Sequence, residues 1–344
     1  MIDTVNIVCA IDEDTFNSLA SYSTVKTAIN CHSDLVLYSI FTDKVEGSYS
    51  SNLNVKIGSG VKYNFFDEVF HFYISIEGSY HKISKGYNSH NGFYDLEFII
   101  RSMINLVECN YNIQLPDYNF WLLYRCDIAI CFDLGNQENV KSYINSLSRC
   151  NYPRRKMKFY TDESLYLSGT TTTLKIYNKL MEFKKHDLKK FYNTDFNLEN
   201  YINEINGFVR FECEIHKKKL NDLFNNKEVS CKEVNYDILK NVWSDEFMKL
   251  LKFIENDLEI VRGREQVLER LKSLYKPRLV NVLFNFYCSI QLNGVKDVQK
   301  YLSEATYYRN LKFLKEAKID ISQCYRVEEC NFYCFNPFTS KEVA

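Results

Sequence analysis

Short runs of alternating apolar and polar residues dominate positions 1–220 and constrain the fold more than any other feature of the chain. Four such runs lie at 5–11, 34–41, 53–58 and 69–76, with Ser, Asn and Gly clusters between them. A period of two is typical of strands that bury one face, and the polar clusters are typical of turns. The pattern therefore predicts an antiparallel sheet.

Helical segments interrupt and then follow this series. Helical spacing occurs at 94–109 and 139–150, strand patterns occur at 120–132, 156–160, 164–169, 171–178 and 207–218, and helical spacing returns at 244–261, 263–275 and 277–294. Strands with interspersed helices followed by helices alone indicate an α+β fold with the helices on one face of the sheet. We therefore expect two domains, at 1–225 and 226–344.

Composition disfavours several classes of protein. No run of about 18 apolar residues occurs, so no membrane span is expected. The start, "MIDTVNIVCAIDEDTF", lacks the basic and apolar parts of a signal peptide, which favours a cytoplasmic location. The 12 cysteines are scattered, and the tightest group (Cys324, Cys330, Cys334) has no CxxC pair or nearby His. Reduced thiols are expected rather than a zinc site.

Positive charge concentrates in the middle of the chain. Residues 1–150 carry 10 Lys and Arg against 17 acidic residues, whereas residues 151–220 carry 14 against 9. A local basic surface can bind phosphates on a nearly neutral protein, because screening limits each charge to about 10 Å. An ordinary solvated face is the structural alternative.

Strand alternation indicates which polar side chains share a surface. At 207–218, Arg210, Glu212, Glu214 and His216 lie opposite an apolar set; at 120–132, Arg125 and Asp127 share a face; at 171–178, Lys175 and Tyr177 share a face that Lys179 would extend. Side by side, Asp127, Glu212 and Glu214 would supply oxygen ligands for Mg²⁺ or Mn²⁺ next to Tyr177.

This set of residues fits phosphoryl transfer to a tyrosine. A free tyrosine has a pKa of about 10 and needs cations or a metal to become a nucleophile. Each residue also has a structural alternative: Tyr177 is one of 26 tyrosines, and the charged residues can form ion pairs on a solvated face. Tyr160 and Tyr166, in neighbouring strands, compete for the role of nucleophile.

A second signal lies near the C-terminus. Residues 295–302 and 304–317 form a helix pair with Ser303 as N-cap, the pattern of a helix-turn-helix. A recognition helix would present side chains of its first half to DNA. The expected DNA contacts are Thr306, Tyr307, Arg309, Asn310 and Lys312. A plain helical hairpin is the alternative.

Several segments, in order, resemble those of the filamentous-phage gene II and gene X type replication initiators and their plasmid rolling-circle relatives. They are the opening "MID", "SHNGF" (89–93), "YRCDIA" (124–129), "LKIYNKLMEF" (174–183), "GFVRFECEIHKKKL" (207–220) and "TYYRNLKFLKEAKIDI" (306–321).

The resemblance implies a nickase domain and a metal-dependent enzyme that cuts one strand at a replication origin, holds the 5′ phosphate on a tyrosine and later rejoins the ends. It implies Tyr177 as nucleophile, Glu182 as the end of the tyrosine motif, and Asp127, Glu212 and Glu214 as ligands of Mg²⁺ or Mn²⁺. Lys179, a catalytic residue with Tyr177 and Glu182, and Arg210 would contact the phosphate. Arg125 and Lys175 are further expected DNA contacts. No His-hydrophobic-His pair occurs, although His90 and His216 could each supply one ligand.

The expected partners are single- and double-stranded origin DNA, with host helicase and polymerase as further candidates. Two other functions stay open: an origin-binding regulator that does not nick, and a mobilisation relaxase.

Overall fold

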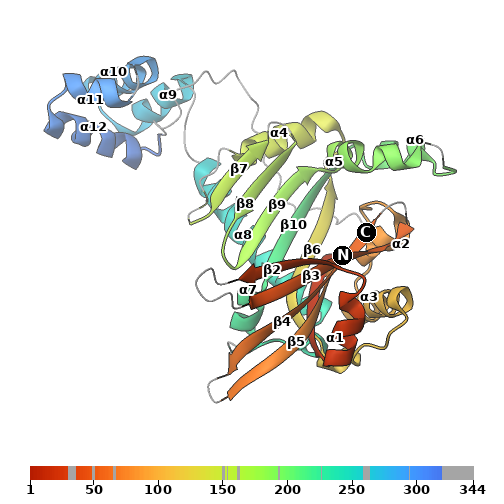
Figure 1. Cartoon of the computed structure of the whole chain (residues 1–344). Helices are drawn as coiled ribbons and strands as arrows, with labels where there is room; N and C mark the ends of the chain where they lie inside the picture. The colour runs from red at the N-terminus through yellow and green to blue at the C-terminus, as the bar shows by residue number, and fades with distance from the viewer. Residues whose placement is uncertain are drawn as a thin grey trace. The chain divides into compact units, whose positions relative to one another are not determined.

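The structure is a computed structural model of the whole chain (Figure 1). It describes residues 1–29, 36–48, 51–64, 67–148, 152, 154–160, 163–192, 194–225, 227–258, 264–293 and 295–319. The cysteine group Cys324, Cys330 and Cys334 lies outside this part of the chain, as does the end of the last family-like segment. Within it, seven cysteines are free thiols.

The described residues form one antiparallel sheet of ten strands in the order β2-β3-β4-β5-β1-β6-β10-β9-β8-β7. The strands are β1 (Ile2–Ile11), β2 (Thr24–Ile29), β3 (Val36–Glu46), β4 (Asn52–Asn64), β5 (Asp67–Gly78), β6 (Leu122–Asp133), β7 (Lys156–Tyr160), β8 (Ser164–Ser168), β9 (Thr172–Asn178) and β10 (Phe208–His216). This confirms the expected α+β class. Sequence patterns missed β2, a partly polar strand at the edge of the sheet.

One face of the sheet is covered by four helices: α1 (Glu13–Ala20), α3 (Leu96–Tyr111), α4 (Gln137–Ser148) and α8 (Tyr236–Leu258). Phe16 of α1 packs on Phe41 of β3, with ring centroids 5.5 Å apart. At the other end of the sheet, Tyr143 of α4 packs on Phe211 of β10, and Trp243 of α8 donates a hydrogen bond to the Phe211 carbonyl. These contacts bury the apolar side of the central strands.

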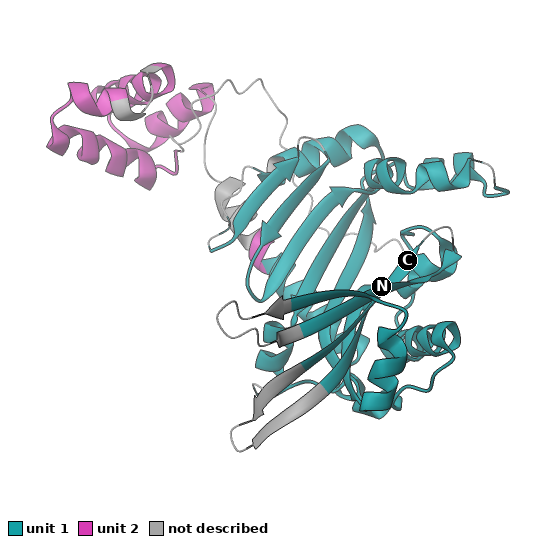
Figure 2. Ribbon diagram, in the orientation of Figure 1, with its two compact units in different colours: residues 1–148, 152–248, 334–344 teal, residues 149–151, 249–333 magenta. Residues whose placement is uncertain are grey.

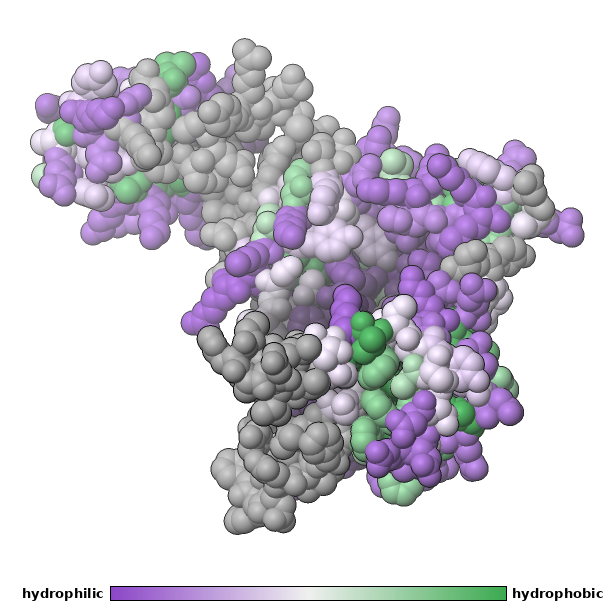
Figure 3. Space-filling model, viewed as in Figure 1, coloured by the Kyte–Doolittle hydropathy of each residue, from purple (hydrophilic) through white to green (hydrophobic). Residues whose placement is uncertain are grey.

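The opposite face is polar in the middle and covered at one end. There α5 (Lys179–His186) and α6 (Leu198–Glu204) pack on Phe208 through Phe183 and Tyr201. Hydrophilic residues gather over this end in Figure 3. The expectation of helices on one face is therefore wrong at this end, because the chain folds back over β10 after β9. Here α2 (Tyr80–Lys85) and the segment after it also contribute.

The remaining helices are α7 (Lys217–Leu223), α9 (Arg264–Leu274), α10 (Pro277–Asn293), α11 (Val295–Tyr301) and α12 (Glu304–Glu316), with single turns at Tyr118–Phe120, Leu188–Phe191 and Cys231–Glu233. Among the described helices, none is long and apolar enough to cross a membrane.

The described residues form two compact units, which divide near residue 248 (Figure 2). The expected boundary at 225 was set at the end of the last predicted strand. The observed division lies later because α8 packs on the sheet through Trp243 and Phe247. The second unit has its own core around Leu271, Leu283 and Leu314. The predicted helix pair is present there, and Ser303 caps α12 by accepting a hydrogen bond from the Thr306 amide.

Candidate active site

Tyr177 is the next-to-last residue of β9, just before the chain becomes a helix. The β-branched residues of "TTTLKIY" favour a strand. Asn178 then ends the strand and accepts a hydrogen bond from the Met181 amide, which caps α5. Tyr177 pairs with Arg210 of β10, and Lys175 pairs with Glu212. The strand predicted at 171–178 is therefore confirmed, and its end places the phenol at the covered end of the polar face.

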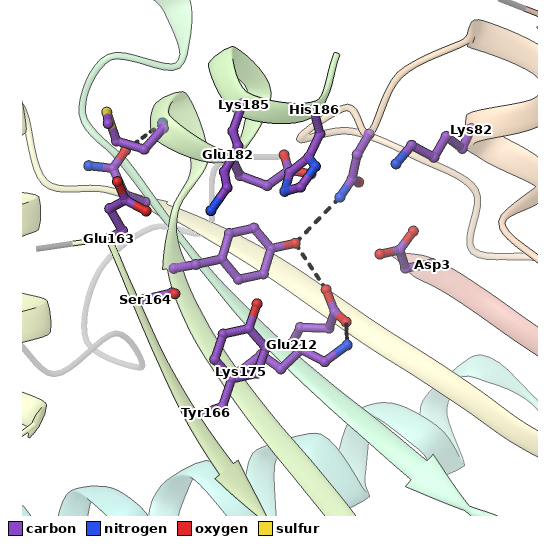
Figure 4. A pocket seen from close by; sticks show the side chains of 14 residues that line it. Asp3, Lys82, Glu163, Ser164, Tyr166, Lys175, Glu182, Lys185, His186 and Glu212 are labelled. Atoms are coloured by element: carbon purple, nitrogen blue, oxygen red, sulfur yellow. Dashed lines mark hydrogen bonds and ion pairs between the residues drawn. The ribbon is translucent and has the colours of Figure 1, made fainter. Parts of the chain in front are cut away.

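Two groups hold the Tyr177 hydroxyl (Figure 4). It donates a hydrogen bond to Glu212 Oε2 at 3.0 Å and accepts one from Asn88 Nδ2 at 3.4 Å. The side chain is 7% exposed, and burial raises its pKa well above that of a free tyrosine. The phenol is thus neutral at physiological pH. Glu212 accepts its hydrogen bond and so lies where a general base would have to be.

Tyr177 lines a pocket of about 320 Å³. Acidic and basic side chains alternate around it, with Lys82 approaching from α2 and Lys185 from α5 (Figure 4). Tyr166 of β8 lines the same pocket, whereas Tyr160 of β7 is 52% exposed and packs edge-on against Tyr166. Of the two competing tyrosines, Tyr166 therefore shares the pocket with Tyr177.

Three carboxylates gather beside the pocket. Asp127 of β6 pairs in register with Glu214 of β10, and Glu212 lies two residues away on the same face. One oxygen of each lies within 4.8 Å of the others. Oxygen donors at this spacing suit a hard divalent cation such as Mg²⁺ or Mn²⁺. Asp127, Glu212 and Glu214, the candidate metal ligands of the sequence analysis, therefore lie together, and their oxygen donors suit such a cation.

Two basic side chains already neutralise part of this charge. Lys175 Nζ lies 2.7 Å from Glu212 Oε1 and 2.6 Å from Glu214 Oε1. Arg125 Nη2 lies 2.6 Å from both Asp127 Oδ2 and Glu214 Oε1. When all three carboxyl groups are ionised, they outnumber these two cations and leave net negative charge in a partly buried site, which favours binding of a further cation.

The carboxylates differ in acidity. Burial, with the charge of Glu212, raises the pKa of Asp127 to about 8 although Arg125 donates two hydrogen bonds to it. Burial also disfavours the charged form of Glu214, but hydrogen bonds from His216 and Lys175 outweigh it and lower its pKa to about 2. Asp127 thus binds a proton more readily than Glu214, because its burial outweighs the ion pair with Arg125.

The raised pKa of Asp127 makes stability depend on pH. An Asp in the unfolded chain titrates near pH 4. Between about pH 4 and pH 8 the folded state therefore binds more protons, so the free energy of unfolding falls as pH rises through this window. We expect Asp127→Asn to reduce this fall by about 2–4 kcal/mol between about pH 5 and pH 8. Urea denaturation without metal measures it; an equal fall in both proteins would contradict the raised pKa.

Two residues expected at the phosphate are instead internal. Lys179 is fully buried and pairs with Glu182 at 2.7 Å, while Glu182 itself lines the pocket. Arg210 is fully buried and pairs with Asp3 at 2.9 Å. A buried, paired cation cannot reach a phosphate on the surface. The exposed part of the pocket's positive charge comes from Lys82 and Lys185, which sequence patterns missed.

The two histidines considered as ligands have different surroundings. His90 contacts Glu204 at 3.2 Å and packs between Tyr201 and Phe208. His216 Nε2 lies 3.6 Å from Glu214 Oε2, at the edge of the carboxylate cluster. His216 is therefore the one placed where it could join these ligands.

Of the five side chains expected to contact DNA in α12, Arg309 and Lys312 are exposed and Thr306 is partly exposed. Tyr307 and Asn310 are only 4% and 3% exposed. They face the core of the helical unit because they lie three residues apart, on the same side of α12 as Leu314. Their expected role as DNA contacts does not fit this placement.

Asp3 and Asn88 also belong to the site, although the sequence did not mark them individually. Both adjoin family-like segments: Asp3 ends "MID", and Asn88 immediately precedes "SHNGF". Asp3 fixes Arg210, and Asn88 contacts the Tyr177 hydroxyl. No local periodicity identifies such residues, because their partners lie far away in the chain.

Fold and site together define a class of protein. It is an antiparallel α+β protein that gathers a tyrosine, three carboxylates and lysines on one face of its sheet. The family model for the N-terminal part of the replication-associated gene II protein of phages matches residues 1–237. The chain belongs to this family of phage replication proteins, which confirms the resemblance to gene II type initiators. No curated protein and no solved structure matches the chain.

Proposed function

We propose that the chain initiates rolling-circle DNA replication by nicking one strand at an origin and holding the 5′ end on Tyr177. The observation that carries this proposal is the Tyr177 hydroxyl, hydrogen-bonded to Glu212 at 3.0 Å beside a carboxylate cluster. A neutral phenol needs a base to become a nucleophile, and Glu212 is in place for that role.

In the nicking step the Tyr177 oxygen attacks the scissile phosphorus. A bond forms between this oxygen and phosphorus, the bond from phosphorus to the 3′ oxygen breaks, and the phenol proton passes to Glu212. The 3′ oxygen leaves and takes a proton from water. Rejoining is the reverse: the 3′ hydroxyl attacks the phosphotyrosine, and the free energy kept in that bond makes ATP unnecessary.

Asp127, Glu212 and Glu214 would hold Mg²⁺ or Mn²⁺. When bound, such an ion supplies Lewis-acid stabilisation of charge on the scissile phosphate. The chain's own cations act separately, since Lys82 and Lys185 line the pocket and attract the DNA backbone. In the helical unit, exposed Arg309 and Lys312 supply further DNA contacts. The proposed substrate is origin DNA, single- or double-stranded. The proposed location is the cytoplasm of the host, where the host helicase and polymerase are further partners.

Nicking can be tested on the supercoiled circular DNA that encodes the chain. Incubation with the protein and Mn²⁺ should convert it to open circles, and chelation of the metal should prevent this. Binding to the origin without any nick would favour the regulator instead. The burial of Tyr177 is the observation that favours the regulator, because an enclosed phenol can have a structural role alone. Nicking at a transfer origin alone would favour the relaxase.

Lys175 competes with a metal for Glu212 and Glu214. We expect Lys175→Met to raise the affinity for Mn²⁺ about tenfold, because removing the ammonium leaves the carboxylates less neutralised. Electron paramagnetic resonance of free Mn²⁺ measures this. The matched control is Lys185→Met, since Lys185 lines the pocket without an ion pair to the cluster. Unchanged or weaker binding in Lys175→Met would contradict the proposed ligands.

A further inference from the structure

The helical unit carries a groove that the proposed chemistry does not use. Two adjacent hollows of about 490 and 390 Å³ share Val282 and Asn310 in their walls. One extends toward the turn between α9 and α10, and the other extends to Tyr301 at the end of α11. The two hollows therefore adjoin one another beside α10 and α12, and we call them together the groove.

The charge around this groove is of one sign. Lys276, Arg278 and Arg309 line the larger hollow, and no carboxylate among the described residues lines either hollow. All three cations are exposed, and none forms an ion pair within the part of the chain that the structure describes. By contrast, Lys300 and Lys312 elsewhere on this unit pair with Asp297 and Glu316. The charge of the larger hollow therefore favours an anionic partner.

The walls of the groove carry exposed apolar side chains. Leu274 is 51% exposed, Val282 is 45% exposed and Tyr301 is 85% exposed. Asn310 is only 3% exposed, so its side chain is not open to a ligand. An occupant with phosphates and exposed apolar faces would match the cations and these walls.

We propose that this groove binds an unpaired DNA strand. The inference rests on the proposed action at an origin, which exposes single strands. A duplex would engage the three cations but keep its bases stacked inside, so the apolar walls would stay unused. An unpaired strand places phosphates on Lys276, Arg278 and Arg309 and a base on Tyr301.

The test compares full-length variants by fluorescence anisotropy without metal. The groove variant is Lys276→Ala/Arg278→Ala/Arg309→Ala, and the control is Lys272→Ala/Lys300→Ala/Lys315→Ala, which removes equal charge from exposed positions outside the groove. For a single strand of about 20 nucleotides, we expect the groove variant to lose about tenfold or more in affinity and its salt slope to fall by about 2. The control should lose less.

Tyr301→Ala is a variant that spares the fold, since the side chain is 85% exposed. It should weaken single-strand binding about fivefold or more through lost stacking. Three results would overturn the proposal. Both groove variants could bind a single strand as tightly as the unchanged protein, or they could lose the same affinity for a duplex of equal length. They could also change the oligomeric state and leave binding unaltered. Because the assay needs no nick, failure of the nicking reaction and failure of the groove are separate results.

Discussion

Tyr177→Phe is expected to abolish nicking, with activity reduced more than about a thousandfold, while affinity for origin DNA stays within about twofold. The substitution removes the oxygen that would bond to phosphorus but keeps the ring that fills the end of the pocket. The lost hydrogen bond to Glu212 should cost about 1 kcal/mol of stability, too little to unfold the protein. Plasmid nicking and anisotropy measure the two effects.

Tyr166→Phe is the matched control, because Tyr166 lines the same pocket from the neighbouring strand. It should retain nicking. If Tyr166→Phe loses activity and Tyr177→Phe keeps it, the nucleophile is Tyr166, and the contact between Tyr177 and Glu212 is structural.

Arg210→Met is expected to lower the free energy of unfolding by about 3–5 kcal/mol. The guanidinium is fully buried, donates to Asp3 at 2.9 Å and donates to the Ser89 carbonyl at 2.8 Å. Removing it leaves the Asp3 carboxylate buried without its partner. Equilibrium urea denaturation measures the loss.

The double variant Asp3→Asn/Arg210→Met tests whether the pair itself causes this loss. Its destabilisation should be smaller than the sum of the two single changes, because neither charge is then left alone. If Arg210→Met instead unfolds at the same urea concentration as the unchanged protein and only binds DNA more weakly, Arg210 contacts phosphate, as the family resemblance implies.

Strand alternation placed each candidate ligand on the polar face of its own strand, and the pairing of β6 with β10 brings these faces together. Asp127, Glu212 and Glu214 lie on one face because each occupies a polar position of an apolar-polar repeat, and their oxygens meet within 4.8 Å. The helix pair near the C-terminus was predictable for a similar reason, since Ser303 is a local cap. These features depend on neighbours in the sequence or on the two-residue period of a strand.

Burial and long-range pairing were not predictable in this way. Arg210 shares the polar face of β10 with Glu212, yet the segment after α2 covers it and Asp3 neutralises it. Lys179 continues the alternation of β9 in the sequence, but α5 begins at that residue and its side chain is buried. In α12 a helical period was visible: Tyr307, Asn310 and Leu314 form one stripe, which should have assigned Tyr307 and Asn310 to the core.

The most direct test of the central claim is to identify the residue that carries DNA. The protein is incubated with single-stranded DNA containing its origin and Mn²⁺, digested, and analysed by mass spectrometry for a covalently bound nucleotide. We expect one adduct, on the peptide that contains Tyr177 and joined through the phenolic oxygen. An adduct on another residue would contradict the assigned site, and tight binding to the origin with no adduct under any divalent metal would contradict the nicking function itself.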